Sequence, residues 1–159
     1  MIDVSMAGAS IVINAAGLKS EPITDFADDG TPIEIPNLEV AGGNMNLNGL
    51  LVTWTKPAPV NISFTLIPGS VSESRLRAFL ASVHIGGKGD TVSNALISTL
   101  VLTYPTYFSN NGSTNRKNAK TVTFSNGRLL SGPPAVGSNN DGKASSTTWN
   151  FMFESFKAS

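Results

Sequence analysis

The chain has 159 residues, with 11 basic and 11 acidic side chains, so its formal net charge is zero. Charged residues make up only 14% of it, against about 25% in an average soluble domain. Without cysteine, the sequence excludes disulfides, thiol catalysis and cysteine zinc sites. No apolar run approaches the roughly 18 residues that cross a bilayer, and the N-terminus lacks the pattern of a secretory signal. We therefore expect no contact with a membrane.

The low charge bears on self-association. Self-repulsion keeps charged proteins apart, and the cores of protein interfaces are depleted of charge. A surface rich in Ser, Thr, Asn and Gly is therefore typical of extensive contacts between copies, and it fits a monomer with a neutral polar surface equally well. The length suits a single domain over residues 1–159, and we expect residues 1–9 to form an N-terminal arm.

Short segments separated by 15 Gly and 9 Pro residues predict a mostly-β protein with many turns. Strands are predicted at 10–14, 23–26, 33–35, 50–55, 60–67, 96–104, 121–124 and 147–156. Asn126-Gly127 is predicted to turn the chain. Loops are predicted at 36–49, 105–119 and 131–145. Long ordered loops in compact domains usually bind something.

The two central strands alternate between apolar and polar residues, which indicates one buried and one polar face. The apolar positions are Leu50, Val52 and Trp54 in the first strand and Val60, Ile62, Phe64 and Leu66 in the second. The polar face carries Thr53, Thr55, Asn61, Ser63 and Thr65. In 96–104 apolar residues occupy both parities, which predicts burial on both faces. The last strand is predicted to turn Trp149, Phe151 and Phe153 inward.

One helix is predicted at about residues 71–85. Ser70 and Glu73 have the spacing of a capping box, in which each side chain reaches the backbone of the other. Four apolar residues at helical spacing form one stripe that is expected to pack on the sheet, namely Leu76, Phe79, Leu80 and Val83. Gly86-Gly87 stands where a C-terminal cap belongs.

Catalytic and metal sites find little support. His84 is the only histidine, and its place near the helix end needs no catalytic explanation. The acidic residues Asp25, Asp28 and Asp29 lack the spacing of a calcium loop, and no pair among Asp25, Glu34 and Glu154 is selected for glycosidic chemistry. The glycine-rich loop 86–91 lacks the spacing of a phosphate-binding loop. We expect no enzyme, no metal and no cofactor.

Three segments resemble the tail tube proteins of contractile-tailed bacteriophages. They are the DFADD turn (25–29), the strand end ISFTLIPGS (62–70) and the helix start SESRLRAFL (72–80). The resemblance covers about residues 10–85, and residues 86–159 match only in general character. It implies a β-sandwich or barrel-like tail tube fold with one flanking helix. It also implies a structural protein of the virion tail, assembled in the host cytoplasm.

The resemblance further implies stacked, hexameric rings that form a tube through which DNA passes without specific binding. Its partners are then other copies of itself and tail proteins such as the sheath, the tape measure and the baseplate. A bore should be polar and not basic, since each Lys or Arg would hold a phosphate. The polar face named above is therefore the expected lumen wall. The loop 36–49 is expected to contact neighbouring subunits through Leu38, Val40, Asn44, Met45 and Leu47.

Two other interpretations remain open. A tube-initiator or baseplate protein of the same fold forms one ring and does not polymerise. A monomeric β-sandwich that binds a ligand such as a carbohydrate needs a row of exposed aromatic residues, for which only Tyr104, Tyr107 and Phe108 qualify.

Overall fold

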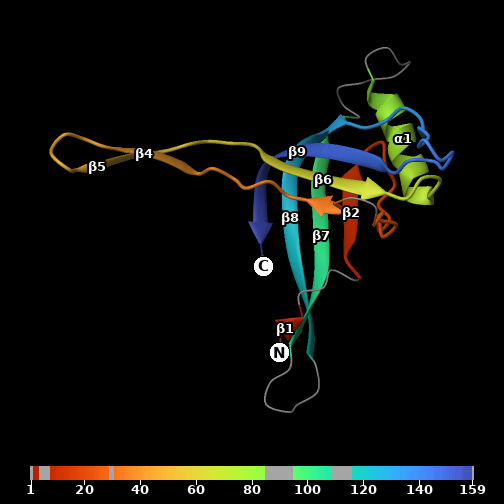
Figure 1. Cartoon of the computed structure of the whole chain (residues 1–159), viewed down its shortest axis with the longest axis horizontal. Coiled ribbons are helices and arrows are strands. Elements are labelled where there is room, and N and C mark those ends of the chain that lie inside the picture. Colours follow the sequence, from red (N-terminus) through yellow and green to blue (C-terminus); the bar gives the residue numbers. More distant parts are fainter. Residues whose placement is uncertain (1, 4–7, 29–30, 85–94, 109–115, 159) are drawn as a thin grey trace.

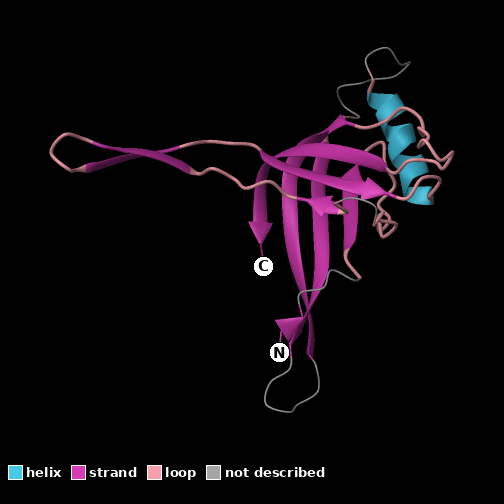
Figure 2. Cartoon of the chain, viewed as in Figure 1, coloured by secondary structure: helices cyan, strands magenta, loops and turns pink. Residues whose placement is uncertain are grey.

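The computed structural model describes residues 2–3, 8–28, 31–84, 95–108 and 116–158. The described elements are β1 (Ile2–Asp3), β2 (Ser10–Ala15), β3 (Ile33–Glu34), β4 (Ala41–Met45), β5 (Leu51–Thr55), β6 (Val60–Leu66), α1 (Val71–Val83), β7 (Ile97–Phe108), β8 (Arg116–Ser131) and β9 (Thr147–Ala158). The predicted mostly-β class with one flanking helix is confirmed (Figures 1 and 2).

Seven strands form one curled antiparallel sheet in the order β1-β7-β8-β9-β6-β3, and β2 also pairs with β7. The segment 23–27 crosses between the two ends of this sheet. Ile23 exchanges backbone hydrogen bonds with Ile11 of β2, and the Ala27 amide donates to the Thr65 carbonyl of β6 at 2.9 Å. These single bridges replace the strand predicted at 23–26, and they bring the sheet close to the expected barrel-like closure.

The core lies inside this curl, and α1 packs beside it (Figure 2). The predicted inward faces of two strands are confirmed. Val60, Ile62, Phe64 and Leu66 of β6 are buried, as are Trp149, Phe151 and Phe153 of β9. The rings of Phe64 and Phe151 stack at 5.3 Å between centroids. The two strands pair along their length from Val60 opposite Phe153 to Leu66 opposite Thr147, so their apolar faces merge into one layer.

Helix α1 begins as predicted, because the Ser70 hydroxyl accepts a hydrogen bond from the Glu73 amide at 3.3 Å. Leu76 and Phe79 are buried, and Leu80 and Val83 pack against the core, so the apolar stripe is confirmed. The predicted second contact of the capping box, from the Ser70 amide to the Glu73 side chain, is wrong. The Ser70 amide donates to the Ile67 carbonyl, and the Glu73 carboxylate turns into the protein. The helix ends at Val83, and residues 86 and 87 lie outside the described residues.

The sheet bends where neighbouring strands carry backbone irregularities, at Ser98 of β7 and Asn126 of β8. Asn14 pairs with Thr99 but Ala15 pairs with Ile97, so Ser98 is an extra residue, a β-bulge. The buried side therefore switches parity from Ile97 to Leu100 and Leu102. The prediction that this strand is buried on both faces is wrong: the bulge puts Ile97 on the same buried side as Leu100 and Leu102, and Val101 lies half-buried on the outer side.

Strand β8 passes through the bend without turning back. Asn126 adopts a left-handed φ of 56°, and β8 continues to Ser131 with Gly127 opposite Phe153. The predicted Asn126-Gly127 turn is therefore wrong. A Cβ on Gly127 would collide with the Phe153 ring and the Met152 carbonyl oxygen, so the glycine serves close approach of the strands.

The predicted loop 105–119 is largely strand, because β7 runs to Phe108 and β8 starts at Arg116. Residues 109–115 lie outside the described part of the chain. Within the expected N-terminal arm, Ile2 and Asp3 pair with Phe108 and Tyr107. Residues 132–145 form a loop, as predicted, with one isolated bridge inside it.

Candidate assembly surfaces

A two-stranded arm, residues 36–59, projects from the body of the molecule (Figure 1). It continues the β3–β6 hairpin outward, and its strands β4 and β5 form a separate sheet from Ala41 opposite Thr55 to Met45 opposite Leu51. The prediction of a loop over 36–49 is therefore wrong for residues 41–45. Gly42, Gly43 and Asn44, three residues typical of a loop, lie in β4, which pairs with no described strand of the body.

Local contacts explain why the arm is a hairpin. At its end, the Asn46 side chain accepts hydrogen bonds from the amides of Asn48 at 3.0 Å and Leu50 at 2.8 Å. Gly49 follows with a φ of 78°, which glycine adopts without strain. Along the arm, the Trp54 indole lies against Gly42, where an added Cβ would be 2.6 Å from the ring. Glycine at position 42 therefore lets the indole lie flat across the hairpin.

The arm has two faces. Val52 and Trp54 point to one side with their partners Asn44 and Gly42. The other side carries Thr53 and Thr55 with Gly43 and Ala41, and Met45 and Leu51 near the tip. The predicted alternation is thus present. The expected burial is wrong, because Leu50, Val52 and Trp54 are 64%, 48% and 47% exposed.

Four of the five residues expected to contact neighbouring subunits are exposed on the arm. Val40, Asn44, Met45 and Leu47 are exposed, and Leu47 at the tip is fully so. Leu38 differs, because it packs against the core of its own chain.

The arm is also uncharged between Glu39 and Lys56. These two residues form an ion pair of 2.8 Å, Nζ to Oε1, at its base. An exposed surface that is apolar and uncharged has the composition of an interface core.

The five residues expected to line a lumen do not lie together. Thr53 and Thr55 are on the arm, whereas Asn61, Ser63 and Thr65 are on β6 in the body. On β6 they join polar residues of neighbouring strands. Ser63 lies between Glu34 of β3 and Asn150 of β9, and Thr65 is buried and hydrogen-bonds Thr148 at 3.1 Å.

A second polar face was missed by the sequence analysis. It covers the outer side of β2, β7, β8 and the end of β9, opposite buried residues such as Ile13 and Phe124. Its cross-strand rows are Ser10-Thr103-Thr121, Val12-Val101-Thr123-Lys157 and Asn14-Thr99-Ser125-Ser155. Lys157 is the only charged residue in these rows. The alternation of Thr and Ser residues after position 98 could have predicted this face. The bulge at Ser98 shifts which residues point outward, so the alternation does not match the residues before it.

A buried carboxylate joins α1 to β9. Glu73 is fully buried, and its Oε1 lies 2.7 Å from Nη2 of Arg77 in an ion pair without the angles of a hydrogen bond. The Thr147 hydroxyl donates to Oε2 at 3.1 Å, and the Trp149 indole N–H donates to that hydroxyl at 3.1 Å. These contacts satisfy the polar atoms of a tryptophan in the centre of the core. The network fixes the helix on the sheet.

A second, exposed ion pair cluster lies near the start of the helix. Glu21 contacts Lys19 at 2.9 Å and also contacts Arg75. The hydrogen bond from Lys19, followed by that from Arg75, lowers the pKa of Glu21 below its ordinary value of 4.5.

The residues weighed for chemistry are spread over the molecule. His84 caps the helix by donating its backbone N–H to the Leu80 carbonyl. Asp25 precedes α1 and accepts a hydrogen bond from Ser72, Glu34 is on β3, and Glu154 is on β9. Within the described ranges, no group of three or more His, Asp or Glu side chains gathers to hold a metal. Among the same residues, no helix has the length and apolarity to cross a membrane.

Solved structures of contractile injection systems share this fold over the whole chain. The PVC sheath/tube terminator of an extracellular contractile injection system aligns with a TM-score of 0.61 over 99% of this chain and 96% of its own, at 10% identity. The anti-feeding prophage cap, a tube terminating cap, aligns with a TM-score of 0.54 over 99% and 91%, also at 10% identity. The chain therefore shares its fold with a sheath/tube terminator and a tube terminating cap. No curated protein matches the chain by sequence.

The family model described as tail fiber protein gp32 matches residues 2–157, and the chain belongs to this family. Family and structural neighbours are named as structural parts of tails and injection systems. The chain is thus a tail-related structural protein. The expected relation to contractile phage tails is therefore confirmed, and the more specific assignment to the tail tube subunits stays a prediction.

Proposed function

We propose that this protein forms a single closed ring at the end of a tail tube, with each arm docked on a neighbouring copy. The observation that carries the proposal is the exposed apolar arm. Neither strand of the arm pairs with a described strand of the body, and an isolated two-stranded hairpin is only marginally stable in water. Packing on a second molecule supplies the burial that the arm lacks.

The size of the exposed surface supports a permanent contact. Eight large apolar residues of the arm and its base are between 45% and 106% exposed, namely Ile35, Val40, Met45, Leu47, Leu50, Leu51, Val52 and Trp54. Dividing the usual burial energy of a large apolar side chain by the energy per Å² gives roughly 100 Å² for each side chain. Scaled by the exposed fractions, the eight residues expose on the order of 500 Å² of apolar surface. A stable interface uses about 800 Å² on each partner. The arm alone provides most of one half-interface.

A heterologous contact of this kind, arm to body, repeats around a ring until it closes. We favour a position at the end of the tube because both structural neighbours named above are described as terminators and match nearly end to end. A stacked tube, with the sheath, tape measure or baseplate as neighbours, is the second candidate. It is favoured by the segments that resemble tail tube proteins.

For the bore we propose two polar faces. One is the Ser/Thr face of β2, β7, β8 and β9, and the other is the β6 face. Both are polar and poor in cations: the β6 face includes the anion Glu34 opposite Ser63, and the rows of the second face contain one cation, Lys157. A wall with few cations lets DNA slide, since each cation holds a phosphate.

Deleting the arm tests the proposal. Glu34 and Ser63 are cross-strand partners, so residues 37–59 can be replaced by a short Gly-Asn turn that closes the β3–β6 hairpin. We expect a folded monomer from the deletion variant and rings from the full chain, measured by light scattering and electron microscopy. Full-chain tubes instead of rings would favour the second candidate. A full chain that stays monomeric at high concentration would refute both.

A further inference from the structure

The bend in the sheet holds a pocket at the edge of the Ser/Thr face, with which it shares Asn14. It is open to the surface, with a volume of about 810 Å³. Apolar groups form much of its lining, with Ala15 at the end of β2 and Ala16 after it, Leu96 just before β7 and Ile97 at its start, and Gly127 of β8. We name it the corner pocket.

The corner pocket exists because of the irregular backbone around it. The bulge at Ser98 and the left-handed Asn126 both lie in its wall. Gly127 has no room for a side chain, so the bend is fixed by the sequence at this position. Bulges often re-aim side chains next to functional sites.

Its polar rim includes Arg128 and Glu154, which carry opposite charges on neighbouring strands β8 and β9. Leu96, also in the lining, is 60% exposed. Protein interfaces likewise combine an apolar core with polar residues at its edge.

The tip of the arm has a chemistry that complements the apolar lining of the corner pocket. Leu47 stands at the tip with its side chain fully exposed, and Met45, Leu50 and Leu51 beside it are each more than 60% exposed. The tip is uncharged, so it can enter an apolar pocket without leaving an unpaired charge.

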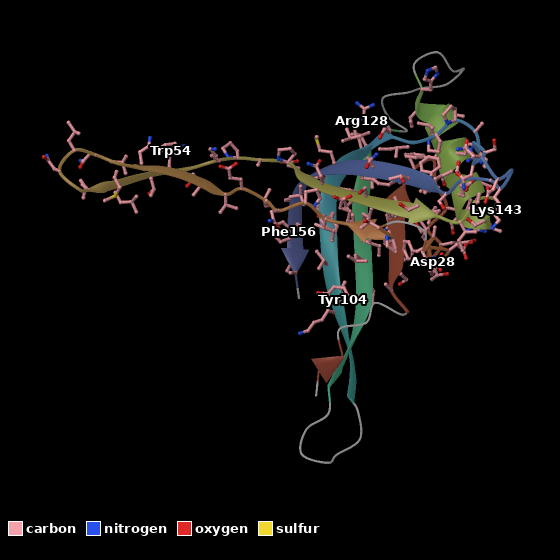
Figure 3. All side chains as sticks on the ribbon, in the orientation of Figure 1. Asp28, Trp54, Tyr104, Arg128, Lys143 and Phe156 are labelled. Atoms are coloured by element: carbon pink, nitrogen blue, oxygen red, sulfur yellow. The ribbon has the colours of Figure 1, made fainter. Side chains whose placement is uncertain are left out.

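The arm does not reach the corner pocket of its own chain. Figure 3 shows Trp54 far out on the arm and Arg128, which lines the pocket, on the body. Because tip and pocket are at separate places on one chain, their contact joins two copies head to tail.

We propose that the arm tip of one copy, centred on Leu47, fills the corner pocket of a neighbouring copy. This inference rests on the proposed ring assembly and names the surface that receives the arm. It makes Leu47 the anchor residue and Ala16, Leu96 and Ile97 its receptor. Side chains that fill a desolvated pocket near the centre of an interface carry much of its affinity.

Cysteine cross-linking tests the contact directly, because the chain contains no cysteine of its own. A Leu47→Cys variant is mixed with a Leu96→Cys variant under mild oxidation and run on a non-reducing gel. A disulfide needs the two Cα atoms within about 7 Å, so we expect efficient dimer formation only from the mixture. The control mixture pairs Leu47→Cys with Val136→Cys, which is exposed outside the pocket.

Filling the pocket gives an independent measurement. Ala16→Trp places an indole in the pocket, and Ala78→Trp makes the same change on an exposed position of α1. We expect Ala16→Trp to raise the dissociation constant of the oligomer at least tenfold and Ala78→Trp to leave it unchanged.

The outcomes separate this inference from the proposed function. Rings that form without the Leu47–Leu96 cross-link, and with normal affinity in Ala16→Trp, overturn the pocket assignment and leave the ring proposal standing. Absence of any oligomer overturns both. Flotation of the protein with phosphatidylcholine vesicles that depends on Leu47, without cross-linking, also overturns the pocket assignment, since the tip then inserts into lipid.

Discussion

In the body of this protein the apolar residues of β6 are at most 7% exposed, whereas Val52 and Trp54 on β5 of the arm are 48% and 47% exposed. Both strands alternate apolar and polar residues, apart from Leu51 at the start of β5, and only four residues separate them. Alternation therefore predicts which face of a strand is apolar and favours burial, but it does not predict whether that face is covered by the same chain or by another molecule. On β6 the cover comes from the same chain, and on β5 we propose that it comes from a neighbour.

The largest expected difference between the two regions is in stability. Phe64→Ala removes a fully buried ring that stacks on Phe151, so we expect the free energy of unfolding to fall by about 3–5 kcal/mol. Trp54→Ala on the arm should change it by less than about 0.5 kcal/mol. Urea denaturation at a protein concentration that keeps the chain monomeric measures both. Equal losses would mean that the arm is part of the folded core.

The next effect concerns the buried carboxylate that holds α1 on the sheet. Glu73→Ala leaves the Thr147 hydroxyl without its acceptor and Arg77 without its partner. We expect a loss of about 2–4 kcal/mol, below the upper range for a buried pair because the Arg77 side chain is 25% exposed. Glu73→Gln, which keeps an acceptor for Thr147, should lose less. If both variants unfold like the wild type, the network does not fix the helix.

A matched pair of glycines sharpens the comparison within the arm. Gly42→Ala places a Cβ 2.6 Å from the Trp54 indole, whereas Gly43→Ala on the opposite face meets only atoms at 3.4 Å or more. We expect Gly42→Ala to displace the indole and to raise the dissociation constant of the oligomer roughly tenfold, or about 1.4 kcal/mol, with little effect from Gly43→Ala. Analytical ultracentrifugation measures both constants. A stronger effect at Gly43 would place the docking face on the threonine side.

The smallest effect is the pH dependence of the exposed cluster around Glu21. The lowered pKa of Glu21 stabilises the folded chain at pH values above 4.5, and this contribution is lost as the pH falls through the folded-state pKa. Glu21→Gln should therefore be slightly less stable than the wild type at pH 7, and the difference should be smaller at pH 3. Thermal unfolding of the two proteins at both pH values tests the sign. A difference that grows on acidification would contradict it.

Local patterns were sufficient for much of the body. Ser70 and the apolar stripe from Leu76 to Val83 predicted the helix, and aromatic alternation in β9 predicted its inner face. These predictions succeeded because each depends on residues a few positions apart. The carboxylate of Glu73 was assigned to the capping box, since its partner Thr147 is far away in the chain.

The bend and the arm were beyond such patterns. Asn126-Gly127 has the composition of a hairpin turn, and only the packing of Gly127 against Phe153 keeps β8 extended. Likewise, the glycines of β4 predicted a loop because a glycine that makes room for Trp54 looks the same in sequence as a glycine that ends a strand. The Ser/Thr face was missed because the bulge at Ser98 shifts its parity.

The continuity of the arm with β6 has a mechanical consequence. A pull on the arm is transmitted along β6, which is paired with β9 over seven consecutive residues. Because the hydrogen bonds of an antiparallel pair run perpendicular to the strands, such a pull loads all of them together in shear instead of opening them one at a time. A ring held by its arms would therefore resist tension through the strongest part of each subunit.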